Sequence, residues 1–202
     1  EFQRIGDKKR KKVCNINIKY LGDAHGKQEL IPQDGIPTVQ VGDLGVGFSP
    51  LNLPSNFWFI RGNHDNPHIA KELEEYLGDF GYFGEVFFVS GAMSCDKSSR
   101  FEGVNWWREE ELPWSKWNSV VESYNGANVI VSHDCPTSIA ESIFGIYDKS
   151  NTRDGLQVLL ESNPPKLWIF GHHHKIVMVE VGQTTFICLA EGEMFDDSKL
   201  TK

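Results

Sequence analysis

Five apolar segments of this chain each run directly into a short loop made of aspartate, asparagine, histidine and glycine. The segments, which read as strands, are residues 13–21, 38–41, 57–60, 128–131 and 166–170. In α/β proteins, ligands gather in the crevice beyond the carboxyl ends of the strands. We therefore expect an α/β fold in which the five polar loops, far apart in sequence, meet at one site.

The remaining segments predict helices and a hairpin. Apolar positions at helical spacing favour helices over residues 69–77, 114–124, 137–144 and 153–161. Residues 85–89 read as a strand, and residues 176–181 and 184–189 as a hairpin that turns at Gly182-Gln183. Residues 26–42 contain Pro32, Gly35 and Pro37 and are too few for a full crossover helix, so we expect only a turn there.

Length and charge limit the organisation and the partners. The 202 residues include 20 lysines and arginines and 28 aspartates and glutamates, so the formal net charge is 20 − 28 = −8. This acidity disfavours binding to extended nucleic acid, and no apolar run approaches the ~20 residues that span a membrane. We expect one domain at residues 13–202 after a basic N-terminal tail at residues 1–12. The oligomeric state stays open.

The four cysteines are Cys14, Cys95, Cys135 and Cys188, and they form no CxxC pair. This spacing excludes a zinc-ribbon or thioredoxin-type site. We expect reduced thiols in a cytoplasmic protein, with two disulfides as the alternative.

The polar loops offer oxygen and imidazole donors without sulfur. The donors are Asp23, His25, Asp43, Asn63, His64, His133, His172 and His174. This set suits manganese, iron, zinc or magnesium rather than a structural thiolate zinc site. One ion does not need so many donors, whereas two ions bridged by a carboxylate do. Such a two-metal site holds the attacking and leaving oxygens of an in-line displacement.

In their order and context the loops resemble the signature of the calcineurin-like metallophosphoesterase superfamily, in particular its small bacterial and phage members. The matching blocks are Asp23-Ala24-His25, Gly42-Asp43, Gly62-Asn63-His64-Asp65, His133 and Gly171-His172-His173-His174. The resemblance implies two packed mixed β-sheets flanked by helices, with a binuclear metal site at the carboxyl ends of strands. It also implies a metal-dependent hydrolase of phosphomonoesters or phosphodiesters.

The resemblance further implies roles for single residues. Asp23, His25 and His174 would hold the first metal, Asn63, His133 and His172 the second, and Asp43 would bridge them. A metal-bridging hydroxide would attack phosphorus, with manganese as the first choice of metal. His64 would donate a proton to the leaving group or a hydrogen bond to phosphate. Asp65 would orient the His64 ring and raise its pKa.

The second block departs from the family pattern Gly-Asp-x-x-Asp-Arg-Gly. Here it reads Gly42-Asp43-Leu44-Gly45-Val46-Gly47-Phe48, without the second aspartate and the arginine. We therefore expect a small phosphorylated substrate, such as a nucleotide, and a phosphate-binding cation from elsewhere in the chain. Arg61 and Arg100 are the candidates, whereas Arg108 is equally well explained as a surface residue.

Alternatives stay open at this point. A serine/threonine protein phosphatase would use the same chemistry, and a catalytically silent binding scaffold would keep the fold. Trp106, Trp107, Trp114 and Trp117 could form a platform that stacks a nucleobase. Packing around the helix after Pro113 is the favoured interpretation of these tryptophans, because tryptophan is largely buried on average.

Overall fold

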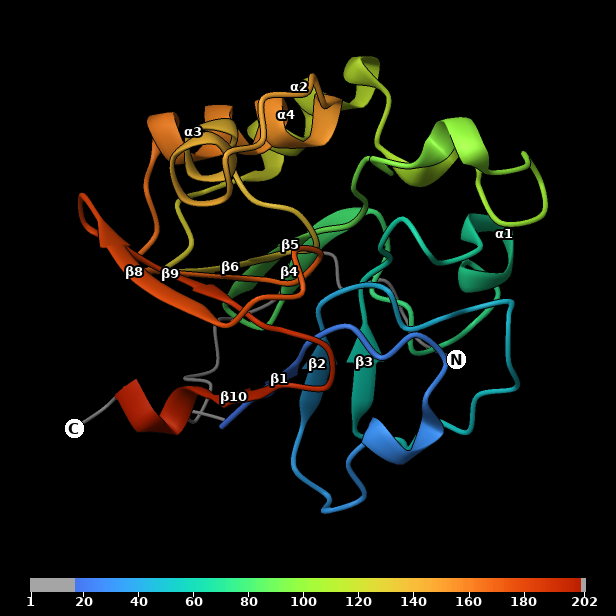
Figure 1. Ribbon diagram of the computed structural model, residues 1–202. Coiled ribbons are helices and arrows are strands. Elements are labelled where there is room, and N and C mark those ends of the chain that lie inside the picture. Colours follow the sequence, from blue (N-terminus) through green and yellow to red (C-terminus); the bar gives the residue numbers. More distant parts are fainter. Residues whose placement is uncertain (1–16, 201–202) are drawn as a thin grey trace.

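The computed structural model describes residues 17–200, which form two β-sheets lying face to face (Figure 1). The strands are β1 Lys19–Leu21, β2 Thr38–Gln40, β3 Phe57–Phe59, β4 Phe80–Phe83, β5 Val86–Val89, β6 Val129–Ser132, β7 Leu167–Phe170, β8 Val177–Val181, β9 Thr184–Cys188 and β10 Met194–Asp196. One sheet has the order β10-β1-β2-β3 and the other β4-β5-β6-β7-β9-β8. Strands β10, β4 and β8 pair antiparallel at sheet edges, and the other pairings are parallel. Both sheets are therefore mixed, as expected.

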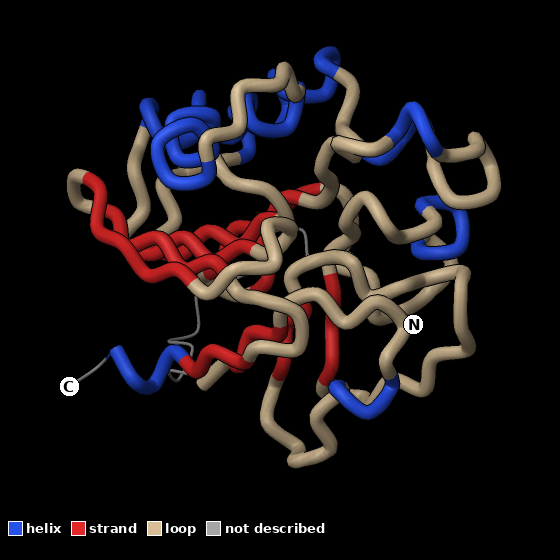
Figure 2. The backbone as a smooth tube through the Cα atoms, in the orientation of Figure 1, coloured by secondary structure: helices blue, strands red, loops and turns tan. Residues whose placement is uncertain are grey.

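Helices cover the outer face of the six-stranded sheet, as Figures 1 and 2 show. They are α2 Trp114–Ser123, α3 Thr137–Ile139, its continuation as a π-helical turn η4 Ala140–Phe144, and α4 Asn151–Ser162. Within the described part of the chain, only short helices accompany the loops around the four-stranded sheet, namely η1 Gln28–Leu30 and α1 Pro67–Ala70. The remaining single turns are η2 Lys97–Ser99, η3 Arg108–Glu110 and η5 Asp197–Leu200.

The central strands are apolar on both faces because both faces are covered. In β5, Phe87 packs into the core beneath the helices, and its neighbour Phe88 packs into the core between the sheets. The same alternation holds for Ile130 and Val131 of β6. Buried strands of this kind read as continuous apolar runs. This pattern explains why the sequence located them well.

One expected helix is much shorter than predicted, and two strands of the structure were not predicted. The helix expected at residues 69–77 ends at Ala70, because the chain then pairs with the edge strand β3. Phe59 N–H donates to the Glu75 carbonyl at 3.0 Å, and Leu77 N–H donates to the Phe59 carbonyl at 3.0 Å. Strands β4 and β10 were not expected. The stretch before β2 does contain only the turn η1, as predicted.

Several sequence-based expectations concern the chain ends and the thiols. Within residues 17–200, no helix has the length and apolar character needed to cross a membrane. Cys95, Cys135 and Cys188 are free thiols. Cys14 and the basic tail at residues 1–12 lie outside the described residues, as do residues 13–16 of the strand expected at 13–21.

Gly155 of α4 is expected to be intolerant of any side chain. A Cβ at this position would lie 2.2 Å from the Trp117 ring of α2. We predict that Gly155→Ala lowers the free energy of unfolding by about 1–3 kcal/mol, although alanine favours helix. Urea denaturation measures the change. Val158→Ala, on the exposed side of the same helix, is the control and should cost less. A Gly155→Ala protein as stable as the parent would contradict this packing.

Candidate metal centre

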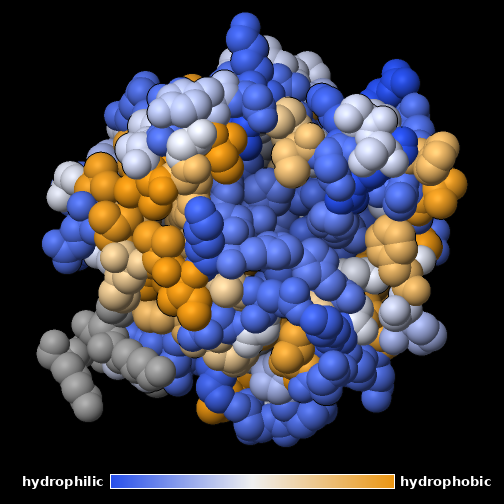
Figure 3. All heavy atoms as spheres, viewed as in Figure 1, coloured by the Kyte–Doolittle hydropathy of each residue, from blue (hydrophilic) through white to orange (hydrophobic). Residues whose placement is uncertain are grey.

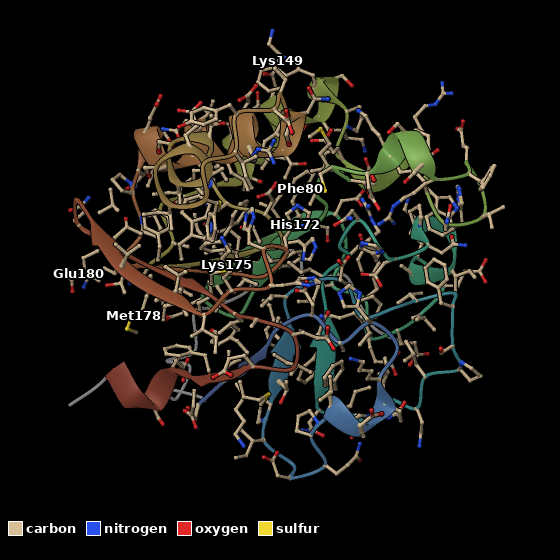
Figure 4. The ribbon with its side chains drawn as sticks, in the orientation of Figure 1. Phe80, Lys149, His172, Lys175, Met178 and Glu180 are labelled. Atoms are coloured by element: carbon tan, nitrogen blue, oxygen red, sulfur yellow. The ribbon has the colours of Figure 1, made fainter. Side chains whose placement is uncertain are left out.

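All five predicted loops meet at the carboxyl ends of β1, β2, β3, β6 and β7. Figure 4 places His172 near the middle of the view, and Figure 3 shows hydrophilic side chains gathered over the same area. Because the strands in each set are parallel, their ends deliver the loops to a common edge. Both sheets therefore contribute to one site.

The first group of donors contains Asp23, His25 and His174, whose ligand atoms lie within 4.8 Å of one another. The Nε2 atoms of His25 and His174 are 3.1 Å apart. Asp23 Oδ2 is buried and has no donor aligned for a hydrogen bond among the described residues, although His174 Nε2 lies 3.0 Å away. A buried carboxylate oxygen with two imidazole nitrogens turned toward it fits a divalent cation.

The second group contains Asp43, His133 and His172, again within 4.8 Å. Asn63 joins it, because its Oδ1 lies 3.2 Å from His133 Nε2. The other ring nitrogen of His133, Nδ1, donates to the Val41 carbonyl at 2.9 Å. That bond leaves Nε2 as the ring atom that faces Asp43 Oδ2, 3.3 Å away, and a metal-binding imidazole is typically anchored through its other nitrogen in this way.

Asp43 contacts parts of both groups. Its Oδ1 accepts the His64 N–H at 2.7 Å, and its Oδ2 faces His133. Its backbone carbonyl accepts the N–H groups of Ala24 and His25 at 3.0 and 2.8 Å. The loop after β1 is thus attached to the loop after β2. The two donor groups are also linked directly, since His172 N–H donates to Asp23 Oδ1 at 3.2 Å.

The backbone of this site is strained where the candidate ligands lie. Among the described residues, the non-glycine residues with positive φ are His25 (47°), Asp43 (58°), His172 (67°) and His174 (50°). All four are candidate ligands. A left-handed conformation costs such residues on the order of 1 kcal/mol or more and persists where the surroundings fix it. The strain therefore marks the loops as shaped for the position of their side chains.

Two glycines give these side chains the room they need. A Cβ on Gly62 would lie 2.1 Å from Asp43 Oδ1, and a Cβ on Gly42 would lie 2.3 Å from His133 Nδ1. Gly42 also has a φ of 102°, which a side chain would disfavour. The Gly-Asp and Gly-Asn blocks therefore need glycine for close approach as well as for the turn.

Burial opposes the charged forms of the residues at this site, and neighbouring opposite charges favour them. Burial opposes ionisation of Asp43, but the adjacent His133 holds the pKa of this carboxyl below its ordinary range. Burial disfavours protonated His133, yet Asp43 raises its pKa to about 10. Asp23 likewise raises the pKa of His174. The negative field of the two carboxylates attracts protons here and would attract metal cations in the same way.

Asp65 has a different role from the one expected. It is buried, and its carboxylate accepts the N–H groups of Gly45, Val46 and Gly62 at 2.7, 2.9 and 2.8 Å, and that of Leu44 at 3.3 Å. No bond to the His64 ring accompanies these among the described residues. The pKa of His64 is lowered, mainly by burial, rather than raised. Asp65 therefore fastens the loop after β2 to the loop after β3.

Arg61 also differs from expectation, whereas Arg100 reaches the site. Arg61 is 2% exposed, and its guanidinium donates to the Glu110 carbonyl at 3.0 Å and pairs with Asp79 at 3.5 Å. It is a buried structural arginine. The Arg100 guanidinium lies 2.9 Å from His64 Nε2. Together with His25, His64 and Phe48 it lines a cavity of about 390 Å³ beside the first donor group.

The structure adds residues that the sequence did not single out as partners. His173 points away from the two donor groups and stacks on Phe144 with 4.1 Å between ring centroids. Its Nε2 lies 3.1 Å from Asp134 Oδ1, and Arg153 pairs with the other oxygen of Asp134 at 3.2 Å. Asp134 thus lies behind His172 and His173 and is paired there with Arg153 of α4.

Two of the tryptophans considered for a nucleobase platform pack in the interior instead. Trp107 and Trp117 are buried, and Trp114 is exposed. Trp107 touches Phe48 edge to face, with centroids 5.8 Å apart. Packing was the favoured expectation, and it holds for Trp107 and Trp117.

Replacement of Asp65 distinguishes a structural role, in fastening the two loops, from a direct action on the His64 ring. Asp65→Asn keeps the size but removes half of the acceptor capacity for the backbone N–H groups of the two loops. We predict a loss of about 1–3 kcal/mol in unfolding free energy and weaker metal binding, measured by urea denaturation and by metal titration. A variant with parent stability and metal affinity but lower turnover would instead support a direct action on His64.

Comparisons with known proteins identify the family of this chain. The chain matches the family model of calcineurin-like phosphoesterases over residues 18–176. One crystal structure with 15% identity superposes with a TM-score of 0.56 and covers 91% of this chain and 96% of its own. A predicted phosphoesterase from Streptococcus pneumoniae has 12% identity, a TM-score of 0.40 and coverages of 87% and 72%.

A phosphopantetheinyl hydrolase from Mycobacterium tuberculosis has 10% identity, a TM-score of 0.45 and coverages of 89% and 92%. The comparison with curated proteins finds no match. The first of these structures shares the fold, and the family model extends over most of the chain and includes every loop of the site. This protein belongs to the calcineurin-like phosphoesterase family.

Proposed function

We propose that this protein is a metal-dependent hydrolase that cleaves phosphomonoesters or phosphodiesters of a small substrate, such as a nucleotide, at a two-metal site. The observation that carries the proposal is the pair of adjacent donor groups, both in contact with the buried Asp43. Each group has the size and chemistry of one divalent site. The absence of sulfur donors from both groups favours hydrolysis over a structural zinc role.

The donors divide between two ions. Asp23, His25 and His174 would hold one, Asn63, His133 and His172 the other, and Asp43 would contact both. Manganese is the metal we expect first, with iron, zinc and magnesium as alternatives. Two bound ions would supply an activated water and neutralise charge on the phosphoryl oxygens.

The protein side of the reaction comes from the cavity beside the first group. Arg100 is held in place by Asp96, 2.7 Å from its Nε, and by the Asn105 carbonyl, 3.2 Å from its Nη1. A guanidinium fixed in this way would bind the phosphoryl oxygens. His64, whose ring lies against Arg100, would donate a hydrogen bond to phosphate or a proton to the leaving group. A cavity of about 390 Å³ suits a small substrate.

Turnover of chromogenic phosphoesters tests the proposal. We predict that p-nitrophenyl phosphate, its bis ester or both are hydrolysed with added Mn²⁺, and that EDTA abolishes the activity. Asp43→Asn should lower kcat by at least about 100-fold, because it removes the charge that we propose the two metal ions share. No metal-dependent turnover by protein with confirmed metal loading would favour the silent scaffold. Turnover of phosphopeptides far above that of nucleotides would favour the protein phosphatase.

Arg100 and Arg108 form a matched pair for testing substrate binding. Arg108 pairs with Glu102 on the surface, and its side chain is 78% exposed. We predict that Arg100→Met raises KM or lowers kcat/KM for p-nitrophenyl phosphate by about 10–100-fold, because a charge-assisted hydrogen bond is lost. Arg108→Met should change neither value by more than about twofold. Equal effects of the two substitutions would show that the general charge of this face, rather than Arg100, binds phosphate.

A further inference from the structure

A buried hydrogen-bond chain leads away from the second donor group. Asn63 Nδ2 donates to Ser94 Oγ at 3.1 Å, and Ser94 Oγ donates to Glu110 Oε2 at 2.5 Å. The Ser94 N–H donates to the other oxygen of Glu110 at 3.0 Å. All three side chains are buried, with exposures of 2%, 1% and 3%. This hydrogen-bond chain ends at Glu110, in the Trp-Trp-x-Glu-Glu-Glu stretch of residues 106–111. The proposed reaction assigns no role to that stretch.

The direction of these bonds follows from the chemistry of the three groups. A carboxylate only accepts hydrogen bonds, and a serine hydroxyl has one proton. Because Glu110 takes that proton, Ser94 Oγ can only accept from its other neighbour. The neighbour must then be the NH₂ end of the Asn63 amide. The amide oxygen consequently faces His133, and it is the oxygen that a metal cation requires.

The backbone around Glu110 is fixed as firmly as its side chain. The Glu110 carbonyl accepts Arg61 Nη1 at 3.0 Å and the Ala92 N–H at 3.1 Å. The Gly91 N–H in turn donates to the Arg61 carbonyl at 2.6 Å. Arg61 is two residues before Asn63. These bonds fasten together the loop that carries Asn63, the loop of Ser94 and the turn of Glu110. The hydrogen-bond chain therefore starts from a carboxylate whose position is fixed.

We propose that Ser94 and Glu110 are positioning residues that hold the Asn63 amide with its oxygen toward the second metal position. This inference rests on the proposed function for the presence of that metal. An amide that is not held can present either end, since its oxygen and nitrogen have nearly the same shape. An NH₂ group toward the cation would repel it. Outer partners of this kind typically contribute about 10–100-fold to metal affinity.

The substitution Glu110→Gln tests the proposal because it reverses the chain without changing its size. The Ser94 N–H requires an oxygen acceptor, so the oxygen of the introduced amide would turn to it. The NH₂ group of that amide would then face Ser94 Oγ and donate to it. The serine proton would turn toward residue 63, and the Asn63 amide would rotate its NH₂ toward the metal. We expect Mn²⁺ titration by calorimetry to show one of two sites weakened by about 10–100-fold, with the other site unchanged.

A second substitution distinguishes this reversal from general damage. In the double variant Asn63→Asp and Glu110→Gln, an aspartate at position 63 accepts the redirected serine proton and still offers oxygen to the metal. We expect it to recover most of the affinity that E110Q loses. Glu111→Gln is the matched control, because Glu111 caps α4 through Ser150 and Thr152 at 2.6 and 3.0 Å. We expect it to leave both Mn²⁺ sites unchanged.

The possible outcomes distinguish a failure of the proposed function from a failure of the positioning role of Ser94 and Glu110. Parent protein that binds fewer than two Mn²⁺ ions contradicts the proposed function itself. Parent protein with two sites, together with an E110Q protein that also keeps two sites of parent affinity, overturns the positioning role alone. An E110Q protein that loses affinity without recovery in the double variant also overturns it, because a merely structural effect would not depend on the donor at position 63. Thermal unfolding of every variant accompanies the titrations.

Discussion

Asp43 is the residue on which the other parts of the site depend. Its carboxylate is almost fully buried, which is unfavourable for a charge unless partners surround it. The partners come from separate segments: the His64 N–H after β3, the His133 ring after β6, and, through the backbone carbonyl, the loop after β1. Keeping one negative charge in this position therefore requires both sheets to end at the same place.

The rest of the local structure follows from that requirement. Asp65 is a second buried carboxylate, and burial together with the charge of Asp43 raises its pKa although backbone N–H groups donate hydrogen bonds to it. Four candidate ligands accept left-handed backbone, and the glycines at 42 and 62 lack the Cβ that would displace Asp43 or His133. These features each cost free energy. The three apolar cores on the faces of the two sheets contribute the stability that offsets them. The site is thus a fixed array of donors at the edge of two packed sheets, which suits the precise orientation that hydrolysis at phosphorus needs.

The sequence predicted the parts of this arrangement that are local. Asp23, Asp43, Asn63 and His133 follow apolar strands, and parallel pairing within each sheet, with the two sheets packed face to face, brings them together. It did not predict contacts that pass between segments. Asp65 was assigned to the neighbouring His64 ring, whereas three of its partners are backbone N–H groups 19 to 21 residues away, and no residue type marks such donors. Arg61 was assigned to phosphate for its charge, but Glu110 and Asp79 hold it in the interior. The helix after Ala70 was lost because β3 had an unpaired edge, which only the sheet order reveals. Glu110 stands out in the sequence as an acidic residue among tryptophans. Its contact with Ser94, 16 residues earlier, follows no sequence pattern and could not be predicted.

We propose that this edge of the two sheets holds two cations that share Asp43. Anomalous diffraction from crystals of the Mn²⁺-loaded protein, recorded at the manganese absorption edge, measures this directly. We expect two peaks about 3.5–4 Å apart, one among Asp23, His25 and His174 and one among Asn63, His133 and His172, with the Asp43 carboxylate in contact with both. A single peak, or a peak at Asp134 and His173 instead, would contradict it.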